Sequence, residues 1–262
     1  SVKKMRFADR IAKSAEEHGS SIVLALDFPF ERPENSSQLY KRAEMVLEMV
    51  HPYICAIKIN HHLILPLGVF DGVQKLVEIA HEKGLPAIAD CKINDIGSTN
   101  QVIAEYYYAA GFDALIANPF VGWEDGLAPV FSITRKLQRG VILLVYMSHK
   151  GADEGYGQIV FDPETRVSIP QYIVFAKKAL LWGADGVVVG ATRPEKVKEV
   201  YVILGEKIPI YSPGVEVQGG SIEAVLKAGA RYLIVGRAIT MSSDPVKTIK
   251  RMLEVASTSV TR

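Results

Sequence analysis

The chain has 262 residues, 48% of them hydrophobic, and its 30 Lys and Arg against 29 Asp and Glu leave a formal net charge of +1. This length suits one barrel-sized domain over residues 1–262 and is too short for two. The balanced charge argues against a nucleic-acid or membrane-surface partner, because either would require a clustered basic excess.

The N-terminal segment, residues 1–20, is charged throughout and lacks the apolar core of a signal peptide. We expect residues 5–18 to form a helical extension ahead of the repeating units. No apolar run reaches the roughly 20 residues of a membrane span. The two cysteines, Cys55 and Cys91, lie in apolar runs, which is not typical of a disulfide scaffold. We expect a cytoplasmic protein.

Eight short apolar runs alternate with helix-length segments along the rest of the chain. Nearly continuous apolar runs are typical of parallel strands buried on both faces. Between them, residues such as Val73, Leu76, Val77 and Ala80 form the stripe of a helix that packs on a sheet. Because no GxGxxG motif follows the first run, we predict a closed α/β fold, a (β/α)8 TIM barrel, rather than an open dinucleotide-binding sheet. The expected strands are Ile22–Asp27, Ile54–Asn60, Ala87–Lys92, Ala114–Pro119, Val141–Ser148, Gly186–Ala191, Ile208–Pro213 and Tyr232–Arg237.

Charged residues of both signs end or directly follow the first three runs: Asp27, Lys58, Asp90, Lys92 and Asp95. Active-site groups of a barrel come from these strand ends. Asp90 and Lys92 are two residues apart, so on a regular strand both project into the barrel mouth. Fixed ammonium groups there can stabilise negative charge that develops during a reaction. The alternative is a structural ion-pair cluster that closes the mouth.

Other polar residues fall outside this array. Asp113 and Asp185 begin strands, at the end of a barrel that serves stability, so we expect structural roles for them. His61 and His62 are adjacent, and the side chains of neighbouring residues rarely converge on one ion. We expect no metal site and no cofactor.

Glycine-rich loops follow the seventh and eighth runs. The segment SPGVEVQGG contains Gly214, Gly219 and Gly220, and Gly236 with Arg237 follows the last run. Loops at these two places form the usual phosphate site of barrels, because glycine allows close approach of backbone N–H groups. The pattern predicts a phosphate site; the alternative is that these glycines only form tight turns.

The stretch after the fifth run, residues 148–168, has no clear periodicity and contains three glycines. Loops of this length in a compact domain are typically functional lids or disordered segments. We predict an active-site lid that excludes water during the reaction.

The motif Asp-x-Lys-x-x-Asp-Ile at residues 90–96, preceded by Lys58 and Asp27, resembles the orotidine 5′-monophosphate decarboxylase family, especially its archaeal branch. The segments SHKGA, SPG with QGG, and the final GR are similar too, and the resemblance extends from Ile22 to the last helix. It implies decarboxylation of orotidine 5′-monophosphate to uridine 5′-monophosphate in pyrimidine nucleotide biosynthesis. It also implies a homodimer that needs neither metal nor cofactor.

The resemblance assigns catalytic roles to the charged array. Lys92 would donate the proton to C6 of the pyrimidine, and Asp90 would lie against the substrate carboxylate. Lys58 would hold the array and the ribose. Asp95 would reach across the dimer interface into the partner's site.

The resemblance also implies contacts with the rest of the nucleotide. Asp27 would bind the ribose hydroxyls and Ser148 would read the pyrimidine edge. Glu216 and Val217 depart from the family pattern, in which small residues are more frequent, and an acidic group beside a phosphate is unfavourable unless it points away. The remaining contacts are Ile96 and Thr99 with the partner's nucleotide, and Pro213, Gln218, Gly219, Gly220, Gly236 and Arg237 with the phosphate.

Two other functions stay open. A Mg²⁺-dependent sugar-phosphate decarboxylase or aldolase-like enzyme of the same superfamily shares the Asp-x-Lys-x-x-Asp motif. It holds the metal partly through a Glu on the second strand, where this chain has Lys58. A non-catalytic phosphate-binding barrel would be marked by loss of Lys92 or Asp90, and both are present.

Overall fold

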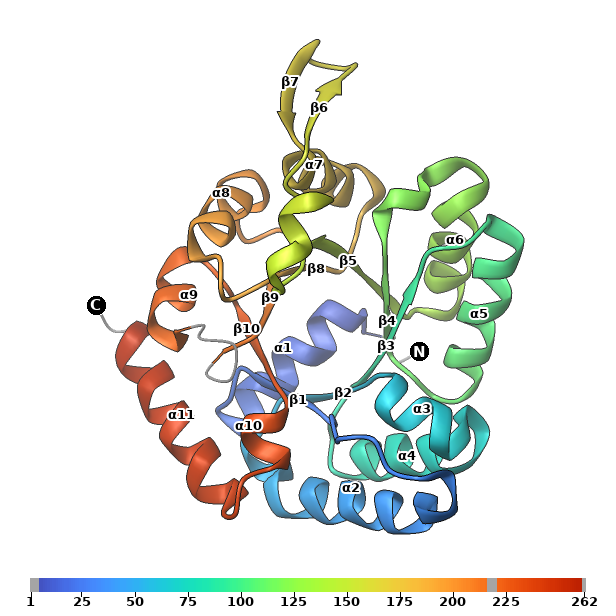
Figure 1. The fold of residues 1–262 in the computed structure, drawn as a ribbon, viewed down its shortest axis with the longest axis vertical. Coiled ribbons are helices and arrows are strands. Elements are labelled where there is room, and N and C mark those ends of the chain that lie inside the picture. The colour runs from blue at the N-terminus through green and yellow to red at the C-terminus, as the bar shows by residue number, and fades with distance from the viewer. Residues whose placement is uncertain (1–4, 216–220, 261–262) are drawn as a thin grey trace.

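The computed structural model describes residues 5–215 and 221–260. Parallel strands form a closed barrel in the order β1-β10-β9-β8-β5-β4-β3-β2, with helices around it (Figure 1). This confirms the predicted (β/α)8 TIM barrel. The barrel strands are β1 (Ile22–Ala25), β2 (Ala56–Ile59), β3 (Ala87–Ile93), β4 (Ala114–Ala117), β5 (Gly140–Tyr146), β8 (Gly186–Val189), β9 (Ile210–Pro213) and β10 (Tyr232–Val235).

Each predicted run overlaps one of these strands, with shifted boundaries. β3 extends one residue past its run to Ile93, and β5 begins one residue earlier, at Gly140. Several other strands end early: β1 ends at Ala25 instead of Asp27, and β8 ends at Val189 instead of Ala191. Beyond these two ends, single inter-strand hydrogen bonds still run from the Leu26 amide to Lys58 and from the Ala191 amide to Pro213. The side chains predicted to do chemistry therefore lie at the transition from strand to loop.

Helices cover the outside of the barrel (Figure 1). In α4, the predicted stripe residues Leu76, Val77 and Ala80 are buried. No described helix has the length and apolarity to cross a membrane, and the cytoplasmic location stays a prediction. The helices are α1 (Phe7–His18), α2 (Ser36–Val50), α3 (His61–Leu67), α4 (Gln74–Glu82), α5 (Gly97–Ala109), α6 (Ala128–Leu137), α7 (Gln171–Trp182), α8 (Pro194–Leu204), α9 (Ile222–Ala228), α10 (Arg237–Thr240) and α11 (Pro245–Val260).

The predicted N-terminal helix, α1, lies across the end of the barrel where the strands begin. Phe7 packs so closely on Gly140, the first residue of β5, that a Cβ added there would lie 2.6 Å from the Phe7 ring. Glycine is therefore required at this position. The helix seals this end of the barrel and leaves the opposite end as the mouth.

The aspartates that begin strands are held by structural contacts. The Asp113 carboxylate accepts hydrogen bonds from Arg10 of α1 at 2.6 Å and from His81 at 2.7 Å. Burial opposes its ionisation, but these partners outweigh burial, so the pKa of Asp113 lies below its usual value. The Asp185 carboxylate accepts from the Val141 backbone at 2.9 Å. Both side chains serve the sealed end of the barrel.

The segment after β5 is not the irregular loop that we expected. Residues 159–170 form an antiparallel hairpin of β6 (Ile159–Asp162) and β7 (Val167–Pro170), which extends outward beyond α7 (Figure 1). The Asp162 carboxylate accepts from Thr165 at 2.7 Å and from Lys177 of α7 at 3.3 Å. These contacts order the turn and tie the hairpin to the barrel wall. The lid role of residues 148–168 stays a prediction.

Candidate active site

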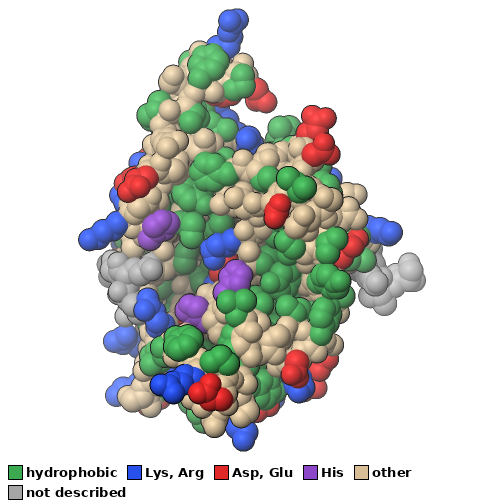
Figure 2. Space-filling model, turned by 45° about the vertical axis from the view of Figure 1, so that its right-hand side comes forward, with side chains coloured by type: hydrophobic (Ala, Val, Ile, Leu, Met, Phe, Trp, Pro, Cys, Tyr) green, Lys and Arg blue, Asp and Glu red, His purple; other side chains and the backbone are tan. Residues whose placement is uncertain are grey.

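The barrel mouth contains a cavity of about 120 Å³ that collects residues from the ends of several strands. Figure 2 shows basic, acidic and histidine side chains around a hollow near the middle of the visible face. Six of the lining residues were predicted from the sequence: Asp27, Lys58, Ser148, Pro213, Gly236 and Arg237. Gly214, which also lines the cavity, was named as part of the glycine-rich loop after the seventh run. Sequence reasoning did not single out the remaining three, Ala25, Val215 and Ile234, because small and apolar residues carry no chemical signal.

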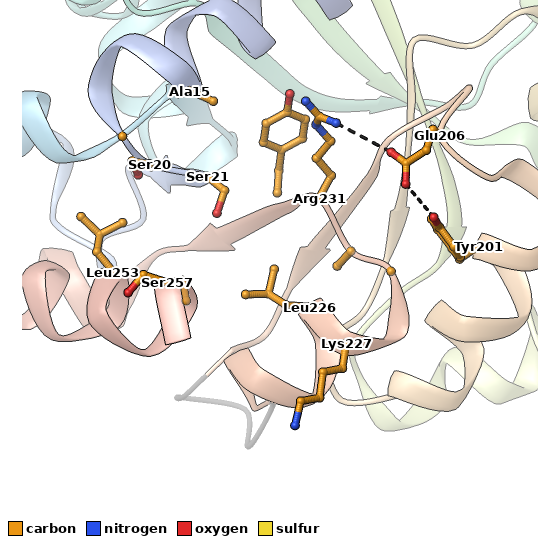
Figure 3. Close-up of a pocket in the computed structure, with 15 residues that line it drawn as sticks. Ala15, Ser20, Ser21, Tyr201, Glu206, Leu226, Lys227, Arg231, Leu253 and Ser257 are labelled. Carbon is orange, nitrogen blue, oxygen red and sulfur yellow. Dashed lines mark hydrogen bonds and ion pairs between the residues drawn. The ribbon is translucent and has the colours of Figure 1, made fainter. Parts of the chain in front are cut away.

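A larger cavity, of about 620 Å³, lies at the opposite end of the barrel (Figure 3). Ser21 and Arg231, which line it, directly precede β1 and β10. Its charged residues are paired: Glu206 lies 3.8 Å from Arg231 and accepts from Tyr201 at 2.6 Å, and Lys227 lies 2.7 Å from Glu223. Because barrel chemistry is built at the other end of the strands, we place the candidate site at the mouth despite its smaller volume.

The charged array is centred on Asp90. Lys58 Nζ donates to one carboxylate oxygen of Asp90 at 2.5 Å, and Lys92 Nζ donates to the other at 2.6 Å. Burial by itself would raise the pKa of Asp90, but the two ammonium groups hold that pKa down to about 2. Burial opposes the charge of Lys58, but the Asp90 and Asp27 carboxylates outweigh it, so the pKa of Lys58 is raised. Asp90 and Lys58 are thus both charged at neutral pH.

Lys92 has an unusual backbone. Its φ of 46° is in the left-handed region, and the register between β3 and β4 shifts between Ala89 and Ile93. The regular strand alternation that we used to pair Lys92 with Asp90 is therefore interrupted, although the two side chains do meet. Left-handed backbone costs a residue with a Cβ about 1 kcal/mol. Such strain gathers at functional sites, where the surroundings must hold it in place.

Asp27, directly after β1, has a carboxylate oxygen without a partner. Within the described part of the chain, its Oδ1 atom is buried and accepts no hydrogen bond. Its other oxygen lies against Gly236, where an added Cβ would come within 2.6 Å of it. Because an unpaired buried oxygen is costly and Asp27 lines the mouth cavity, its carboxylate is a candidate acceptor for a ligand donor.

Asp95, Ile96 and Thr99 lie on the outer surface at the start of α5. All three side chains are exposed, and 63% of the Ile96 surface is accessible. The Asp95 carboxylate accepts from the Ile96 amide at 2.7 Å and forms no ion pair with any residue of the described ranges. The chain thus does not bring Asp95 into its own Lys58–Asp90–Lys92 cluster.

Only part of the two predicted phosphate loops lies within the residues that the structure describes. Pro213 ends β9, and Gly236 and Arg237 connect β10 to α10, all on the wall of the mouth cavity. Arg237, whose side chain is exposed, is the first residue of α10. Gln218, Gly219 and Gly220, with the divergent Glu216 and Val217, lie outside the described residues.

Ser148 follows β5, and its position is fixed by a neighbouring loop. Its carbonyl oxygen accepts from the Thr192 hydroxyl at 2.8 Å. The residues after it are anchored by Asp153, which accepts from the Tyr146 hydroxyl and lies 3.0 Å from Arg193. The start of segment 148–168 is therefore held against the loop after β8, near the mouth.

Sequence reasoning missed one residue beside the array. His62 was considered only as a metal ligand, but its Nδ1 atom accepts from the Phe28 amide at 3.2 Å, next to Asp27. The signal was its position directly after a strand end, one residue beyond His61. In residues 5–215 and 221–260, no group of three or more His, Cys, Asp or Glu side chains is placed to hold a metal ion, and the metal-free reaction stays a prediction.

Comparison with known sequences gives a consistent family. A model of the orotidine 5′-phosphate decarboxylase / HUMPS family matches residues 20–252. The orotidine 5′-phosphate decarboxylase of Methanosarcina mazei is 37% identical over 229 residues, which cover 87% of this chain and 91% of the relative. That of Thermococcus kodakarensis is 36% identical over 235 residues, covering 90% of this chain and 96% of the relative.

Solved structures agree with this result. Orotidine 5′-monophosphate decarboxylase from Methanocaldococcus jannaschii, complexed with the inhibitor BMP, superposes with a TM-score of 0.75 at 32% identity. The match covers 90% of this chain and 98% of that one. The orotidine 5′-phosphate decarboxylase from Pyrococcus horikoshii gives a TM-score of 0.72 at 35% identity, covering 90% and 99%. The similarity in sequence and fold thus extends over nearly the whole chain.

Proposed function

The chain belongs to the orotidine 5′-phosphate decarboxylase / HUMPS family, and from this premise we propose that it converts orotidine 5′-monophosphate to uridine 5′-monophosphate in pyrimidine nucleotide biosynthesis. The proposal includes catalysis without metal or cofactor. The observation that carries it is the placement of two ammonium groups on the single buried carboxylate of Asp90, at 2.5 and 2.6 Å, beside the mouth cavity.

The reaction needs a fixed positive charge. When the bond between C6 and the carboxylate breaks, CO₂ leaves and the electron pair stays on C6, where no neighbouring group can delocalise it. An ammonium about 4 Å from that carbon contributes roughly 4 kcal/mol at an effective dielectric constant of about 20. Lys92 is suited to this role, because its side chain is 36% exposed while Asp90, which also binds the cavity-lining Lys58, holds its amine. It then gives its proton to C6 and recovers one from water.

The neighbouring groups of the array position Lys92 and the ribose. Asp90, held by Lys58 on its other oxygen, fixes the direction of the Lys92 amine and places negative charge where the substrate carboxylate enters. Asp27 offers its unpartnered Oδ1 to a ribose hydroxyl. Arg237 and Gly236 contact the phosphate, whose binding energy helps to order the site for the reaction.

A homodimer completes the proposed site. Exposed apolar side chains, Val102 and Tyr106, lie on α5, the helix that Asp95 and Ile96 precede, and Phe70 contacts Tyr106 with ring centres 5.9 Å apart. Leu65 and Phe70 are 76% and 55% exposed. A surface of this kind supports a protein–protein contact. In the dimer, Asp95, Ile96 and Thr99 would reach the partner's nucleotide.

One assay tests the reaction. The purified protein is incubated with orotidine 5′-monophosphate and excess EDTA while the absorbance of the orotate ring is followed. We expect full turnover. If activity instead appeared only with added Mg²⁺ and a sugar phosphate, the Mg²⁺-dependent alternative would replace this proposal. An inert protein would support the non-catalytic barrel.

Subunit mixing tests the shared site. Lys92→Ala and Asp95→Ala homodimers are each expected to be inactive, but their heterodimers contain one site with both residues intact. We therefore expect partial recovery of activity. Because one of the two sites in each heterodimer is intact, a heterodimer can reach about half the activity of a wild-type dimer. Verified heterodimers without any recovery would overturn the role of Asp95 across the interface.

A further inference from the structure

The main chain around Asp27 is fixed on both sides of its carboxylate. The Asp27 amide donates to the Ala25 carbonyl at 2.8 Å. The Asp27 carbonyl accepts from the Thr240 hydroxyl at 2.6 Å, and the next amide, of Phe28, donates to His62 Nδ1 at 3.2 Å. Asp27 lies beyond the end of β1, and among the residues that the structure describes no hydrogen bond to a neighbouring strand holds its backbone. Thr240 of α10 and His62 of α3 hold the backbone there instead.

The position of His62 is itself determined locally. Asn60 ends the turn after β2 and caps α3 by accepting from the His62 amide at 2.9 Å. This cap orients the first turn of α3 toward the loop after β1. For Nδ1 to accept the Phe28 amide, the neutral ring must carry its proton on Nε2. His62 Nδ1 then lies 4.0 Å from Asp27 Oδ1, which leaves that oxygen without a hydrogen bond from the ring.

We propose that His62 and Thr240 are positioning residues, which hold the Asp27 main chain so that its carboxylate faces the nucleotide ribose. This inference rests on the proposed function, and specifically on contact between Asp27 and a ribose hydroxyl. The two residues act through Asp27 and do not contact the reacting atoms, which adjoin Lys92.

The expected defect is one of substrate binding. Without the Nδ1 acceptor, the Phe28 amide turns toward water and the Asp27 carboxylate loses its direction. A correctly oriented Asp27 carboxylate contributes about one hydrogen bond to substrate binding. Its loss should lower kcat/KM about tenfold, mostly by raising KM. The loss should depend on the ribose hydroxyls, because they are the part of the nucleotide assigned to the Asp27 carboxylate.

The experiment compares matched variants on matched ligands. His62→Leu removes the acceptor, whereas His62→Asn places an amide oxygen near the Nδ1 position. Thr240→Val and Thr240→Ser form the same pair at the other anchor. For each, kcat and KM are measured with orotidine 5′-monophosphate, and dissociation constants with uridine 5′-monophosphate and its 2′,3′-dideoxy analogue. We expect His62→Leu to weaken binding of the natural nucleotide about tenfold and the analogue less than about twofold, with His62→Asn restoring most of the loss.

Two outcomes overturn the inference. Equal loss on both nucleotides would mean that His62 supports the fold of the mouth without directing Asp27. Additive losses in the Asp27→Ala/His62→Leu double variant would mean that the residues act independently. Failure of the proposed function is distinguishable, because it would show as a wild-type protein that does not decarboxylate orotidine 5′-monophosphate at all.

Discussion

Two buried carboxylates at opposite ends of the barrel have similar charge but different surroundings. At the mouth, Asp90 receives two lysine ammonium groups, and at the sealed end Asp113 receives Arg10, His81 and Arg139 together with a backbone amide. Both carboxyl pKa values are lowered by their partners. By charge and burial alone, either cluster would qualify as a functional site.

The difference lies in the backbone and in the end of the barrel. Arg10, His81 and Arg139 line a cavity of about 520 Å³, but they tie α1 to the beginnings of strands and saturate the Asp113 carboxylate. Lys92, in contrast, lies at the strand ends, where barrels build their active sites, and has a left-handed backbone. A cluster of buried charges beside a cavity is therefore not by itself a sign of chemistry. A cation at the mouth, on backbone that folding alone would not choose, is the more informative feature.

The largest expected effect is a loss of kcat on substitution of Lys92, at the mouth of the barrel. Lys92→Ala should lower kcat at least about a thousandfold, because it removes both the stabilising charge and the proton donor. The variant should still fold, as judged by circular dichroism and thermal unfolding. Turnover of orotidine 5′-monophosphate measures the effect, and a near-normal kcat would contradict the assigned role.

Asp113→Asn, at the sealed end, should lower the stability of the fold and leave kcat nearly unchanged. Removing the charge leaves Arg10 and Arg139 without their buried partner, so we expect the free energy of unfolding to fall by about 3 kcal/mol. Denaturant titration measures this loss. The kcat of the folded fraction should change less than about twofold, since the mouth is untouched. A selective loss of kcat with unchanged stability would remove the distinction between the ends.

The pH dependence of stability sharpens the comparison at Asp90. Its folded pKa of about 2 is below the ordinary 3.8, so the carboxylate stabilises the folded state above pH 3.8 and the contribution is lost as pH falls toward 2. The difference amounts to about 2 kcal/mol. Unfolding titrations between these pH values should show a shallower slope in Asp90→Asn than in wild type. Identical slopes would mean that the lysines do not hold the carboxylate ionised.

The smallest effect concerns strain at the mouth. Lys92→Gly and Lys92→Ala both remove the amine, but only glycine accepts a φ of 46° without a steric penalty. The glycine variant should be more stable than the alanine variant by about 1 kcal/mol. Thermal unfolding of the pair measures the strain directly. Equal stabilities would indicate that the loop relaxes when the lysine is absent.

The barrel and the place of its charges could be predicted because they depend on local patterns. Continuous apolar runs indicate parallel strands, and charges at the ends of such runs must lie together at one rim. The left-handed backbone of Lys92 could not be predicted, because no glycine or asparagine stands there. The β6–β7 hairpin carried a signal, since two short β-branched runs flank residues 163–166, but the surrounding glycines were read as a loop. The role of His62 depends on contact between two loops that are distant in sequence.

The β6–β7 hairpin is a suitable site for attaching a label to the protein. Its exposed turn, residues 163–166, is anchored through Asp162 to Lys177 on the barrel wall and projects away from the helices (Figure 1). Exposed loop tips tolerate insertions well. A dye or affinity peptide inserted there would tether single molecules to a surface while the charged rim stays free to meet nucleotide.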